Sequence, residues 1–342
     1  MRIGFDVSPL VRPHPPGIVR VVRELTAELE RRGVVDVVRL EPPAQGSLRS
    51  WRQSALPKTV HNENLVGIHS FVSAFPWRGP GRRVCTIHEL PWKHGVRENA
   101  GLRHRFWASF GRRLADRVVT ATERVARDLG KSDRVRVVPW GVAPPFEDEP
   151  PPGVVDEPVL AKYGLSDSTY ALCVGAVRPK KNLEAVLRGT AALRERNGPR
   201  LQLVVTGEHT PDLRRDLGLA SKLGLSAWLS TPGRVEEADL PALYRLAAVV
   251  PFLSRSEGFG LPVLEALACS TPVVVPQGSA QAEVAGEHGI VVDANDPVSI
   301  AEGLERAVAQ REALRYRVSE RARELTWTHA AERIEALWKE LA

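Results

Sequence analysis

Short runs rich in β-branched residues alternate along this chain with longer segments of helical periodicity. Because parallel strands need a long crossover connection, usually a helix, this alternation is typical of parallel sheets that helices cover on both faces. The pattern predicts strands at residues 3–7, 34–39, 83–87, 117–120 and 134–138, and again at 170–174, 201–205, 248–253 and 272–275. The clearest helical segments between them are residues 18–32, 183–196 and 239–247. We therefore expect an α/β protein with parallel sheets.

A stiff, polar segment separates the two sets of strands. Residues 143–158 contain six prolines and five acidic residues, which suit a linker better than a core element. The length of 342 residues also exceeds that of most single domains. We expect a first domain at residues 1–150, a second at 151–325, and a last helix at 326–342 that packs back toward the first domain. Helical periodicity covers residues 318–341, with Trp327, Ile334, Leu337 and Trp338 available for packing.

The composition disfavours membrane-spanning, secreted and metal-binding proteins. No apolar stretch approaches the roughly 20 residues that span a bilayer, and the first residues read as a strand rather than as a secretory signal. Three separate cysteines, Cys85, Cys173 and Cys269, form no zinc or disulfide pattern, and no Asp-x-Asp metal motif is present. We expect a cytoplasmic protein with buried thiols and no bound metal or other cofactor.

Positive charge is concentrated in the first part of the chain. Residues 1–150 contain 25 Lys and Arg against 16 Asp and Glu, whereas the remainder contains 22 against 25. Much of the excess lies in residues 103–127, with Arg103, Arg105, Arg112, Arg113, Arg117, Arg124 and Arg127. A basic surface suits an anionic membrane at the inner face, a phosphorylated acceptor or nucleic acid, but a solvated helix face explains the charge equally well. Nucleic acid is the least favoured partner, because no nucleic-acid-binding motif accompanies the charge.

The most informative stretch for function is residues 254–275, SRSEGFGLPVLEALACSTPVVV. It predicts a loop with Gly258 and Gly260 after a strand, and then a short helix over residues 261–268 with Pro262 in its first turn. The free N–H groups of a helix start carry partial positive charge and suit a pyrophosphate. Glycines in the preceding loop let the backbone approach such a ligand closely.

Two carboxylates, Glu257 and Glu265, flank this helix start. Carboxylates accept hydrogen bonds from sugar hydroxyls, although glutamates near helix starts are also common as caps. Their spacing resembles the Glu-x7-Glu signature of the retaining glycosyltransferase family 4, which has the GT-B fold. The resemblance implies that Glu257 lies by the donor sugar and that Glu265 binds the ribose. It also places at the donor the matching residues between them, Gly258, Phe259, Gly260 and Leu261.

The resemblance covers most of the chain. Residues 174–189 are similar to the family's glycine-then-basic loop, which implies that Gly175 lies at the donor. Residues 233–247 are similar to the segment that begins beside the nucleobase, which implies the same place for Gly233, Arg234 and Val235. Residues 278–297, after the donor loop, and residues 15–29 and 86–92 of the first domain also match.

Cations near residue 180 are candidates for stabilising a leaving diphosphate, because fixed cations lower the barrier to its departure. Lys181 is the first choice, since it matches the family's lysine before the next helix. The family often has an arginine directly after the glycine, where this chain has Ala176. Arg178 is the second candidate, and Lys180 is an alternative carrier of that missing charge. Solvated loop cations remain the simple alternative.

Two residues of the first domain are further candidates. His88 follows a predicted buried strand, where open α/β sheets present residues to a cleft, and the resemblance places it near the donor sugar. A structural histidine is the alternative. Gly17 lies in the first loop and is expected to make space for the diphosphate, with an ordinary turn glycine as the alternative.

These observations predict a GT-B protein of two Rossmann-like domains whose parallel sheets face a central cleft. The expected activity is metal-independent, retaining transfer of a mannose-like hexose from a nucleoside-diphosphate sugar, which is a substrate rather than a cofactor. The expected acceptor is a glycan or lipid-linked hydroxyl in surface polysaccharide or glycolipid synthesis. Two alternatives are a sugar-nucleotide hydrolase or epimerase, and a catalytically silent binder or basic docking protein.

Overall fold

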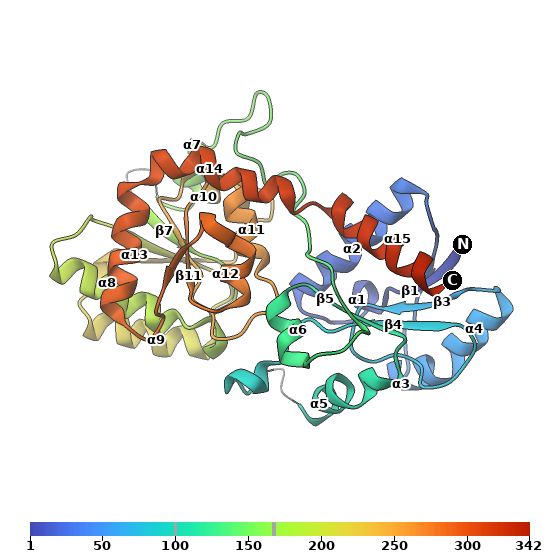
Figure 1. Cartoon of the computed structure of the whole chain (residues 1–342). Helices are drawn as coiled ribbons and strands as arrows, with labels where there is room; N and C mark the ends of the chain where they lie inside the picture. Colours follow the sequence, from blue (N-terminus) through green and yellow to red (C-terminus); the bar gives the residue numbers. More distant parts are fainter. Residues whose placement is uncertain (99–100, 166–168) are drawn as a thin grey trace. The chain divides into compact units, whose positions relative to one another are not determined.

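The computed structural model describes residues 1–98, 101–165 and 169–342. They form two compact units (Figure 1): residues 1–141 with 325–342 make unit 1, and residues 142–324 make unit 2. Both units combine parallel strands with helices, which confirms the expected α/β architecture. Within the described ranges, none of the helices has both the length and the hydrophobicity required to cross a bilayer.

Unit 1 is built on a six-stranded parallel sheet in the order β2-β1-β3-β4-β5-β6. Its strands are β1 (Arg2–Asp6), β2 (Asp36–Leu40), β3 (Gly67–Ser70), β4 (Arg82–Thr86), β5 (Arg117–Thr120) and β6 (Val135–Val137). Its helices are α1 (Ser8–Val11), α2 (Pro16–Arg32), α3 (Leu48–Ser50), α4 (Leu56–Asn62), α5 (Leu102–Ser109), α6 (Glu123–Leu129) and α15 (Trp327–Leu341), with the π turn η1 (Trp51–Ala55) and the 3-10 turns η2 (Pro91–His94) and η3 (Gly111–Leu114).

Helix α2 shows why this part of the chain folds as it does. Its apolar residues Val21, Val22, Leu25 and Leu29 recur at helical spacing and are buried. The helix ends at Gly33, whose left-handed backbone (φ 64°) favours glycine, and whose N–H donates to the carbonyl of Leu29. Helix α15 packs against α2, so the end of the chain completes unit 1.

The helical periodicity over residues 318–341 extends across two helices rather than one. The structure has two helices, α14 (Arg311–Glu324) and α15, separated by Leu325 and Thr326. The backbone of Thr326 is extended, and its hydroxyl accepts a hydrogen bond from the N–H of His329 at 3.1 Å. Thr326 is thus an N-cap, a start signal that the apolar periodicity on both sides obscured.

Unit 2 contains two three-stranded parallel sheets, β7-β8-β9 and β10-β11-β12. They are joined by a parallel bridge between Ala171 and Val249, beside β7 and β10. The N–H groups of Leu172 and Ala248 donate across the junction to the carbonyls of Val249 and Tyr170, at 3.0 and 2.8 Å. The resulting order, β9-β8-β7-β10-β11-β12, is that of a doubly wound Rossmann-like sheet.

The elements of unit 2 follow each other as strand and helix. The strands are β7 (Tyr170–Cys173), β8 (Gln202–Thr206), β9 (Leu229–Gly233), β10 (Val250–Pro251), β11 (Val273–Pro276) and β12 (Ile290–Val292). The helices are α7 (Glu157–Lys162), α8 (Leu183–Glu195), α9 (Pro211–Lys222), α10 (Leu240–Leu246), α11 (Leu261–Ala268), α12 (Ala280–Ala285), α13 (Pro297–Ala309) and α14, with the 3-10 turns η4 (Pro179–Lys181), η5 (Ser226–Trp228) and η6 (Gly286–His288).

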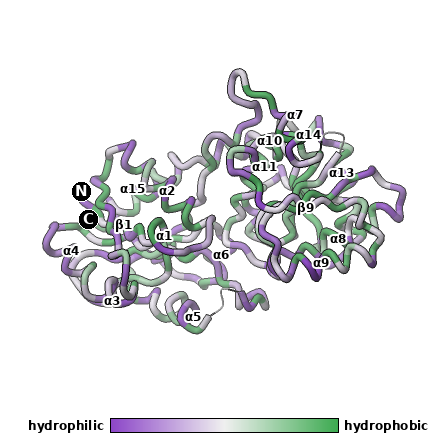
Figure 2. The backbone as a smooth tube through the Cα atoms, turned by 180° about the vertical axis from the view of Figure 1, so that it is seen from behind, coloured by the Kyte–Doolittle hydropathy of each residue, from purple (hydrophilic) through white to green (hydrophobic). Residues whose placement is uncertain are grey.

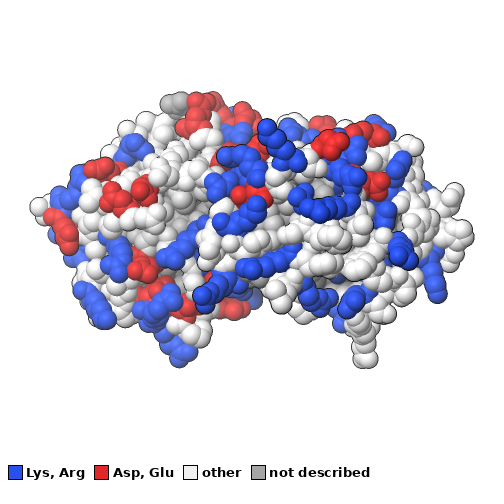
Figure 3. Space-filling model, turned by 60° about the horizontal axis from the view of Figure 1, so that its bottom comes forward, with Lys and Arg blue, Asp and Glu red and all other residues white. Residues whose placement is uncertain are grey.

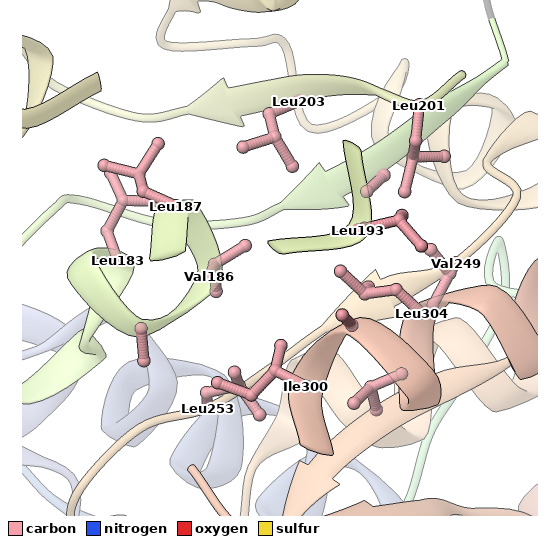
Figure 4. Close-up of a cluster of buried hydrophobic side chains, with 14 of the residues drawn as sticks. Leu183, Val186, Leu187, Leu193, Leu201, Leu203, Val249, Leu253, Ile300 and Leu304 are labelled. Carbon is pink, nitrogen blue, oxygen red and sulfur yellow. The ribbon is translucent and has the colours of Figure 1, made fainter. Parts of the chain in front are cut away.

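The core of unit 2 lies between α8, α13 and the sheet (Figure 4). The figure shows Val186 of α8, Ile300 of α13 and Leu203 of β8 in one apolar cluster, and all three side chains are buried. The two helices approach closely at Gly189, where a Cβ atom would lie only 2.2 Å from Cγ2 of Ile300. A larger side chain at residue 189 would therefore force the helices apart.

Strands β3, β9 and β12 were not predicted from the sequence. β3 is GIHS and β9 is LSTPG, so each contains residues that are depleted in strands. β12 has only three residues. These segments are strands because they pair in parallel with neighbouring strands. Such pairing depends on the tertiary fold and is not visible in the local sequence.

The segment at residues 143–158 is only partly the linker that its composition predicts. It forms a long loop before α7 (Figure 1), and Figure 2 shows it as a mixture of hydrophilic and hydrophobic residues. Two of its residues belong to the interior of unit 2, however. Phe146 is buried, with its ring centroid 6.0 Å from that of Tyr244, and Asp156 is buried in an ion pair with Arg245. The loop is therefore anchored at both points.

Candidate functional site

The centre of the unit 2 sheet brings two loops together. β7 and β10 are adjacent there, and the sheet order reverses between them. In open α/β sheets, ligands bind outside the carboxyl ends of the strands at such a switch point. The loop after β7 leads through η4 to α8, and the loop after β10 leads to α11. These loops carry most of the site residues predicted from the sequence.

The loop after β7 has a backbone built for close approach. Gly175 has a positive φ of 103°. A Cβ atom on Gly207, which follows β8, would lie 2.7 Å from the carbonyl carbon of Gly175, so the two loops are in direct contact. Asn182 begins α8 in the left-handed region (φ 57°), and its side-chain amide donates to the carbonyl of Leu253 at 3.2 Å.

The loop after β10 ends in the predicted helix. α11 spans Leu261–Ala268, as the sequence predicted, and Gly260 before it has a φ of 101°. Gly258, Phe259 and Gly260 are buried, and Leu261 is partly buried. In the first turn of α11 the N–H groups of Val263 and Leu264 donate to the carbonyl of Gly260, at 2.9 and 3.4 Å.

An ion pair joins the two loops. Nζ of Lys181 donates to Oε1 of Glu257 at 2.9 Å and also lies 4.4 Å from the ring centroid of Phe252. Nζ of Lys180 lies 3.9 Å from Oε2 of the same carboxylate. Burial alone would raise the pKa of Glu257, but the charges of Lys181 and Lys180 outweigh it and hold the pKa below its usual value. Glu257 is therefore a carboxylate at neutral pH.

Further contacts between these loops were not foreseen from the sequence. The backbone N–H of Arg255 donates to the carbonyl of Lys180 at 2.8 Å, and its Nε donates to Oδ1 of Asn182 at 3.2 Å. The hydroxyl of Ser256, beside Glu257, is buried and makes no hydrogen bond within the described part of the chain. Serines and arginines are common in exposed loops, so no sequence signal distinguished these residues.

The second predicted carboxylate has a partner of its own. Glu265 is buried in α11, and Oε2 accepts a hydrogen bond from the hydroxyl of Tyr244 at 2.9 Å. The carbonyl of Tyr244, in α10, accepts in turn from the hydroxyl of Thr271 at 2.5 Å. Sequence reasoning missed Tyr244, because its contact with Glu265 is made between two helices.

The other candidates of unit 2 lie at the carboxyl ends of β7 and β9. Gly233 is the last residue of β9 and has a φ of 82°. Its carbonyl accepts from the N–H of Gly207 at 2.8 Å. Arg234 is exposed and Val235 is partly buried. Arg178 is exposed and directly precedes η4.

The candidates of unit 1 lie on separate segments. Gly17 is exposed in the first turn of α2. His88 is partly buried after β4, and its Nε2 lies 2.8 Å from the carbonyl oxygen of Phe71. The surrounding protein lowers the pKa of His88 to about 4 by desolvation, so the ring is neutral at pH 7. A neutral ring with this hydrogen bond is compatible both with a structural role and with contact to a ligand.

A second histidine was not predicted at all. His69 lies in β3, stacked between Phe5 and Phe71 with ring centroids 5.6 and 4.9 Å away. Its Nε2 lies 3.0 Å from the hydroxyl oxygen of Thr86. Complete burial lowers the pKa of His69 to about 3.

We expect His69 to reduce stability in mild acid. The unfolded chain protonates this ring near pH 6.5, whereas the folded chain does so only near pH 3. The neutral ring therefore contributes its full stabilisation above pH 6.5. Below that pH the free energy of unfolding falls by about 1.4 kcal/mol per pH unit, so that about 2 kcal/mol is lost at pH 5. Urea unfolding at pH 7 and 5 should show that the wild type loses about 2 kcal/mol more than His69→Gln. Equal losses would contradict this assignment.

The buried aspartate of unit 1 fixes the loop that leads to α2. Asp6 ends β1, and its carboxylate accepts from Nε of Arg52 at 2.8 Å and from the N–H of Ser8 at 3.0 Å. A second guanidinium nitrogen of Arg52 donates to the hydroxyl of Ser8 at 2.7 Å. The network satisfies a fully buried carboxylate at the carboxyl end of the sheet.

The second unit matches a known family. Residues 157–325 match the family model described as "Glycosyl transferases group 1". The O-antigen chain mannosyltransferase B of Escherichia coli is 32% identical over 173 residues, which cover 50% of this chain and 45% of that protein. The D-inositol 3-phosphate glycosyltransferase of Corynebacterium jeikeium is 27% identical, over 99% of this chain and 96% of that protein. The chain spans about half the length of the curated relatives to which it is more than 30% identical.

Solved structures match along the whole chain. Sucrose-phosphate synthase from Thermosynechococcus elongatus has a TM-score of 0.77 at 21% identity and covers 100% of this chain and 99% of its own. HepE from Anabaena, solved in complex with UDP-glucose, has a TM-score of 0.74 at 16% identity and covers 99% of this chain and 100% of its own. At these identities the likeness concerns the fold. The second unit therefore belongs to the group 1 glycosyltransferase family, and the chain has the GT-B fold.

Proposed function

We propose that this chain is a retaining, metal-independent glycosyltransferase that moves a mannose-like hexose from a nucleoside-diphosphate sugar to an acceptor hydroxyl. The observation that carries the proposal is the assembled pair of loops at the carboxyl ends of β7 and β10. It combines the Lys181–Glu257 ion pair, the start of α11 and the buried Glu265. These are a cation, the positive end of a helix and two carboxylates, which suit a diphosphate and two sugar rings.

The reaction breaks the bond between the anomeric carbon and the diphosphate oxygen. The acceptor oxygen forms the new bond on the same face, and its proton passes to the departing diphosphate. Lys181 stabilises the charge that develops on the diphosphate, with Arg178 or Lys180 as the second cation and the positive end of the α11 dipole as a further contribution. Glu257 lies by the donor sugar and Glu265 binds the ribose. Gly175, Gly233, Arg234 and Val235 border the nucleotide.

Two comparisons support the choice of substrates. The family relatives are named for transfer of mannose to O-antigen and of a glycosyl group to inositol 3-phosphate, and HepE was solved with UDP-glucose. A nucleotide-linked hexose is thus the expected donor. The expected acceptor is a glycan or a lipid-linked hydroxyl in surface polysaccharide or glycolipid synthesis.

Calorimetric titration with UDP-, GDP-, ADP- and dTDP-sugars tests the proposal. One of the four should bind, and Glu265→Gln should weaken its binding. Added acceptor candidates should then yield a glycoside that keeps the anomeric configuration of the donor. Release of nucleotide at the same rate without any acceptor would instead identify a hydrolase. Binding without any turnover would identify a silent binder.

The basic segment at residues 103–127 is less uniformly charged at the surface than its sequence suggests. Arg112 donates to the carbonyl of Leu129, Arg117 pairs with Glu340, and Arg124 lies against Asp128. The exposed arginines of this segment are Arg103, Arg105, Arg113 and Arg127. Figure 3 turns forward the side of Figure 1 on which α5 lies, and Lys and Arg predominate on that face.

Exposed apolar side chains accompany these arginines. Leu102, Phe106, Phe110 and Leu114 are exposed and recur every four residues along α5 and η3. Leu102 is 84% exposed, and the Phe106 ring lies 5.9 Å from that of the exposed Trp77. Apolar side chains beside exposed arginines are the combination with which proteins bind anionic bilayers. We therefore assign this surface, the α5 surface, to peripheral membrane contact.

Binding to vesicles should depend on both components of the α5 surface. Burying a phenylalanine contributes about 1.5–3 kcal/mol, so the variant with both Phe106→Ser and Phe110→Ser should bind vesicles containing anionic phospholipid at least about 100-fold more weakly. Co-sedimentation with such vesicles measures the change. The matched control is Val291→Ser with Val298→Ser, which removes two exposed valines of unit 2. Binding that is unchanged at high salt would rule out the electrostatic part.

A further inference from the structure

Helix α7 ends in a well-defined backbone geometry. Gly164, which follows the C-cap residue Tyr163, has a left-handed backbone (φ 70°), and its N–H donates to the carbonyl of Ala161 at 3.1 Å. The N–H of Leu165 donates to the carbonyl of Leu160 at 2.9 Å. These two bonds form a Schellman motif, and Leu165 is fully buried. The backbone that carries the side chain of Tyr163 is therefore fixed.

The hydroxyl of Tyr163 joins α7 to residues 234–239, the segment that connects β9 to α10. It accepts a hydrogen bond from the backbone N–H of Glu236 at 3.2 Å and donates to Oδ2 of Asp239 at 2.7 Å. These partners lie 73 and 76 positions further along the chain. One hydroxyl thus restrains the connecting segment at its middle and at its end.

Asp239 is oriented toward α7 rather than toward its own helix. It is the N-cap residue of α10, where an aspartate commonly accepts from an N–H of the first turn. Among the residues that the structure describes, its side chain makes no such capping bond, and Nζ of Lys162 donates to Oδ2 at 2.6 Å. Burial alone would raise the pKa of Asp239, but the hydrogen bonds from Lys162 and Tyr163 outweigh it and hold the pKa below its usual value. A charged acceptor strengthens the bond from the Tyr163 hydroxyl.

The two side chains of α7 that contact this segment differ in exposure. Lys162 also pairs with Oε1 of Glu236 at 2.7 Å, but the two side chains are 42% and 69% exposed, so water screens this pair. Tyr163 is partly buried, and the Asp239 side chain that accepts its bond is 15% exposed. We therefore expect Tyr163 to contribute more of the restraint than Lys162.

We propose that Tyr163 is a positioning residue for the nucleobase of the donor, because its hydroxyl holds residues 234–239 in the conformation that borders the base. The assignment rests on the proposed function, in which Gly233, Arg234 and Val235 border the nucleotide. Only the fraction of the protein with the competent conformation binds, so a segment that is fixed in advance gives a higher affinity. Other loops bind the diphosphate, and its affinity does not depend on Tyr163.

Tyr163→Phe tests the assignment, since it removes the hydroxyl and keeps the ring. Calorimetry with UDP, GDP, ADP and dTDP identifies the nucleoside diphosphate that the wild type binds, and inorganic pyrophosphate is the reference ligand without a base. We expect the variant to bind that nucleoside diphosphate about 5- to 20-fold more weakly, and pyrophosphate within about twofold of the wild type. KM for the donor should rise by a similar factor with kcat within about twofold, because the segment contacts the base equally in the ground state and the transition state.

The matched control is Tyr170→Phe. Tyr170 is fully buried, and its hydroxyl donates to the carbonyl of Leu243 in α10 at 2.7 Å, so this change removes the same atom without touching residues 234–239. It should lower the melting temperature at least as much as Tyr163→Phe and leave both affinities within about twofold. Equal weakening of nucleoside diphosphate binding in the two variants would mean that a general loss of stability is the cause, and would overturn the assignment.

Hydrogen exchange of the wild type provides a measurement that does not depend on a variant. Peptides that cover residues 233–239 should exchange more slowly when the nucleoside diphosphate is bound, and at an unchanged rate with pyrophosphate. Unchanged exchange at a saturating concentration of the nucleoside diphosphate, or wild-type affinity in Tyr163→Phe, would overturn the assignment while leaving the proposed function intact. Failure of the wild type to bind any of the four nucleoside diphosphates would overturn both.

Discussion

Replacing Lys181 with methionine is expected to lower kcat/KM for sugar transfer by about 10²–10³. The substitution keeps the length of the side chain and its contact with the ring of Phe252, but removes the charge. Removing one fixed donor aimed at a developing negative charge costs about 2.7–4 kcal/mol of transition-state stabilisation. Steady-state rates at several donor concentrations measure the effect. The fall should be mainly in kcat, because the charge on the diphosphate develops as the glycosidic bond breaks.

The control for this substitution is Lys222→Met. Lys222 is exposed at the end of α9, so the same change of charge and shape should leave kcat/KM within about twofold. If the loss of any one lysine slowed the reaction through a general electrostatic effect, kcat/KM would fall equally in both variants. That result would contradict a specific role of Lys181. Glu257→Gln adds a further test, since residues in one ion pair are not independent. The kcat/KM of the variant with both Lys181→Met and Glu257→Gln should fall by much less than the two single effects combined.

The sequence predicted the donor loop well because its determinants are local. Gly260 needs a positive φ, Pro262 suits the first turn of a helix, and the apolar residues after it follow a helical period. The observed α11 therefore has the predicted bounds. The strand β10 was predicted too long, at residues 248–253 against Val250–Pro251. Its apolar run continues past the ladder, since the next residues are buried without being paired as a strand.

Which of Arg178 and Lys180 lies beside Glu257 could not be predicted from the sequence. Arg178 precedes the turn with an extended backbone, whereas Lys180 lies within the 3-10 turn of residues 179–181. Which one faces Glu257 depends on where the loop before α11 lies, and that is set by contacts between segments about 75 residues apart, such as Asn182 with Leu253 and Lys181 with Glu257.

Long-range pairing also explains why the acidic loop before α7 was interpreted only as a linker. Asp156 looks like one more acidic residue in a Pro-rich stretch. Its partner, Arg245, lies in α10, 89 positions later. The pair has two hydrogen bonds, 2.6 Å from Nε to Oδ2 and 2.7 Å from Nη2 to Oδ1. The side chains are 5% and 9% exposed, so the pair is an interior element that composition cannot identify.

Arg245→Met should therefore destabilise unit 2 by about 3–5 kcal/mol. The substitution leaves the carboxylate of Asp156 buried without its cation, and breaking a buried pair from one side costs this much because the remaining charge stays desolvated. It also removes the donor to the carbonyl of Glu147 at 3.2 Å. Urea unfolding, followed by a fluorescence probe in unit 2, measures the change. Pairing Arg245→Met with Asp156→Leu should recover most of the loss, since a buried ion pair can be replaced by apolar residues at little cost.

The matched control is Arg188→Met, which breaks the exposed i,i+4 pair with Glu184. Exposed pairs on helices contribute about 0.3–0.5 kcal/mol, because water screens both charges. The two substitutions thus remove the same kind of side chain and leave a carboxylate without its cation, and they differ mainly in burial. If Arg188→Met and Arg245→Met lost stability equally, burial of the Asp156–Arg245 pair would not be what holds the loop before α7 in place. Loss confined to Arg245→Met, with recovery in the double variant, would identify the unpaired carboxylate as the cause.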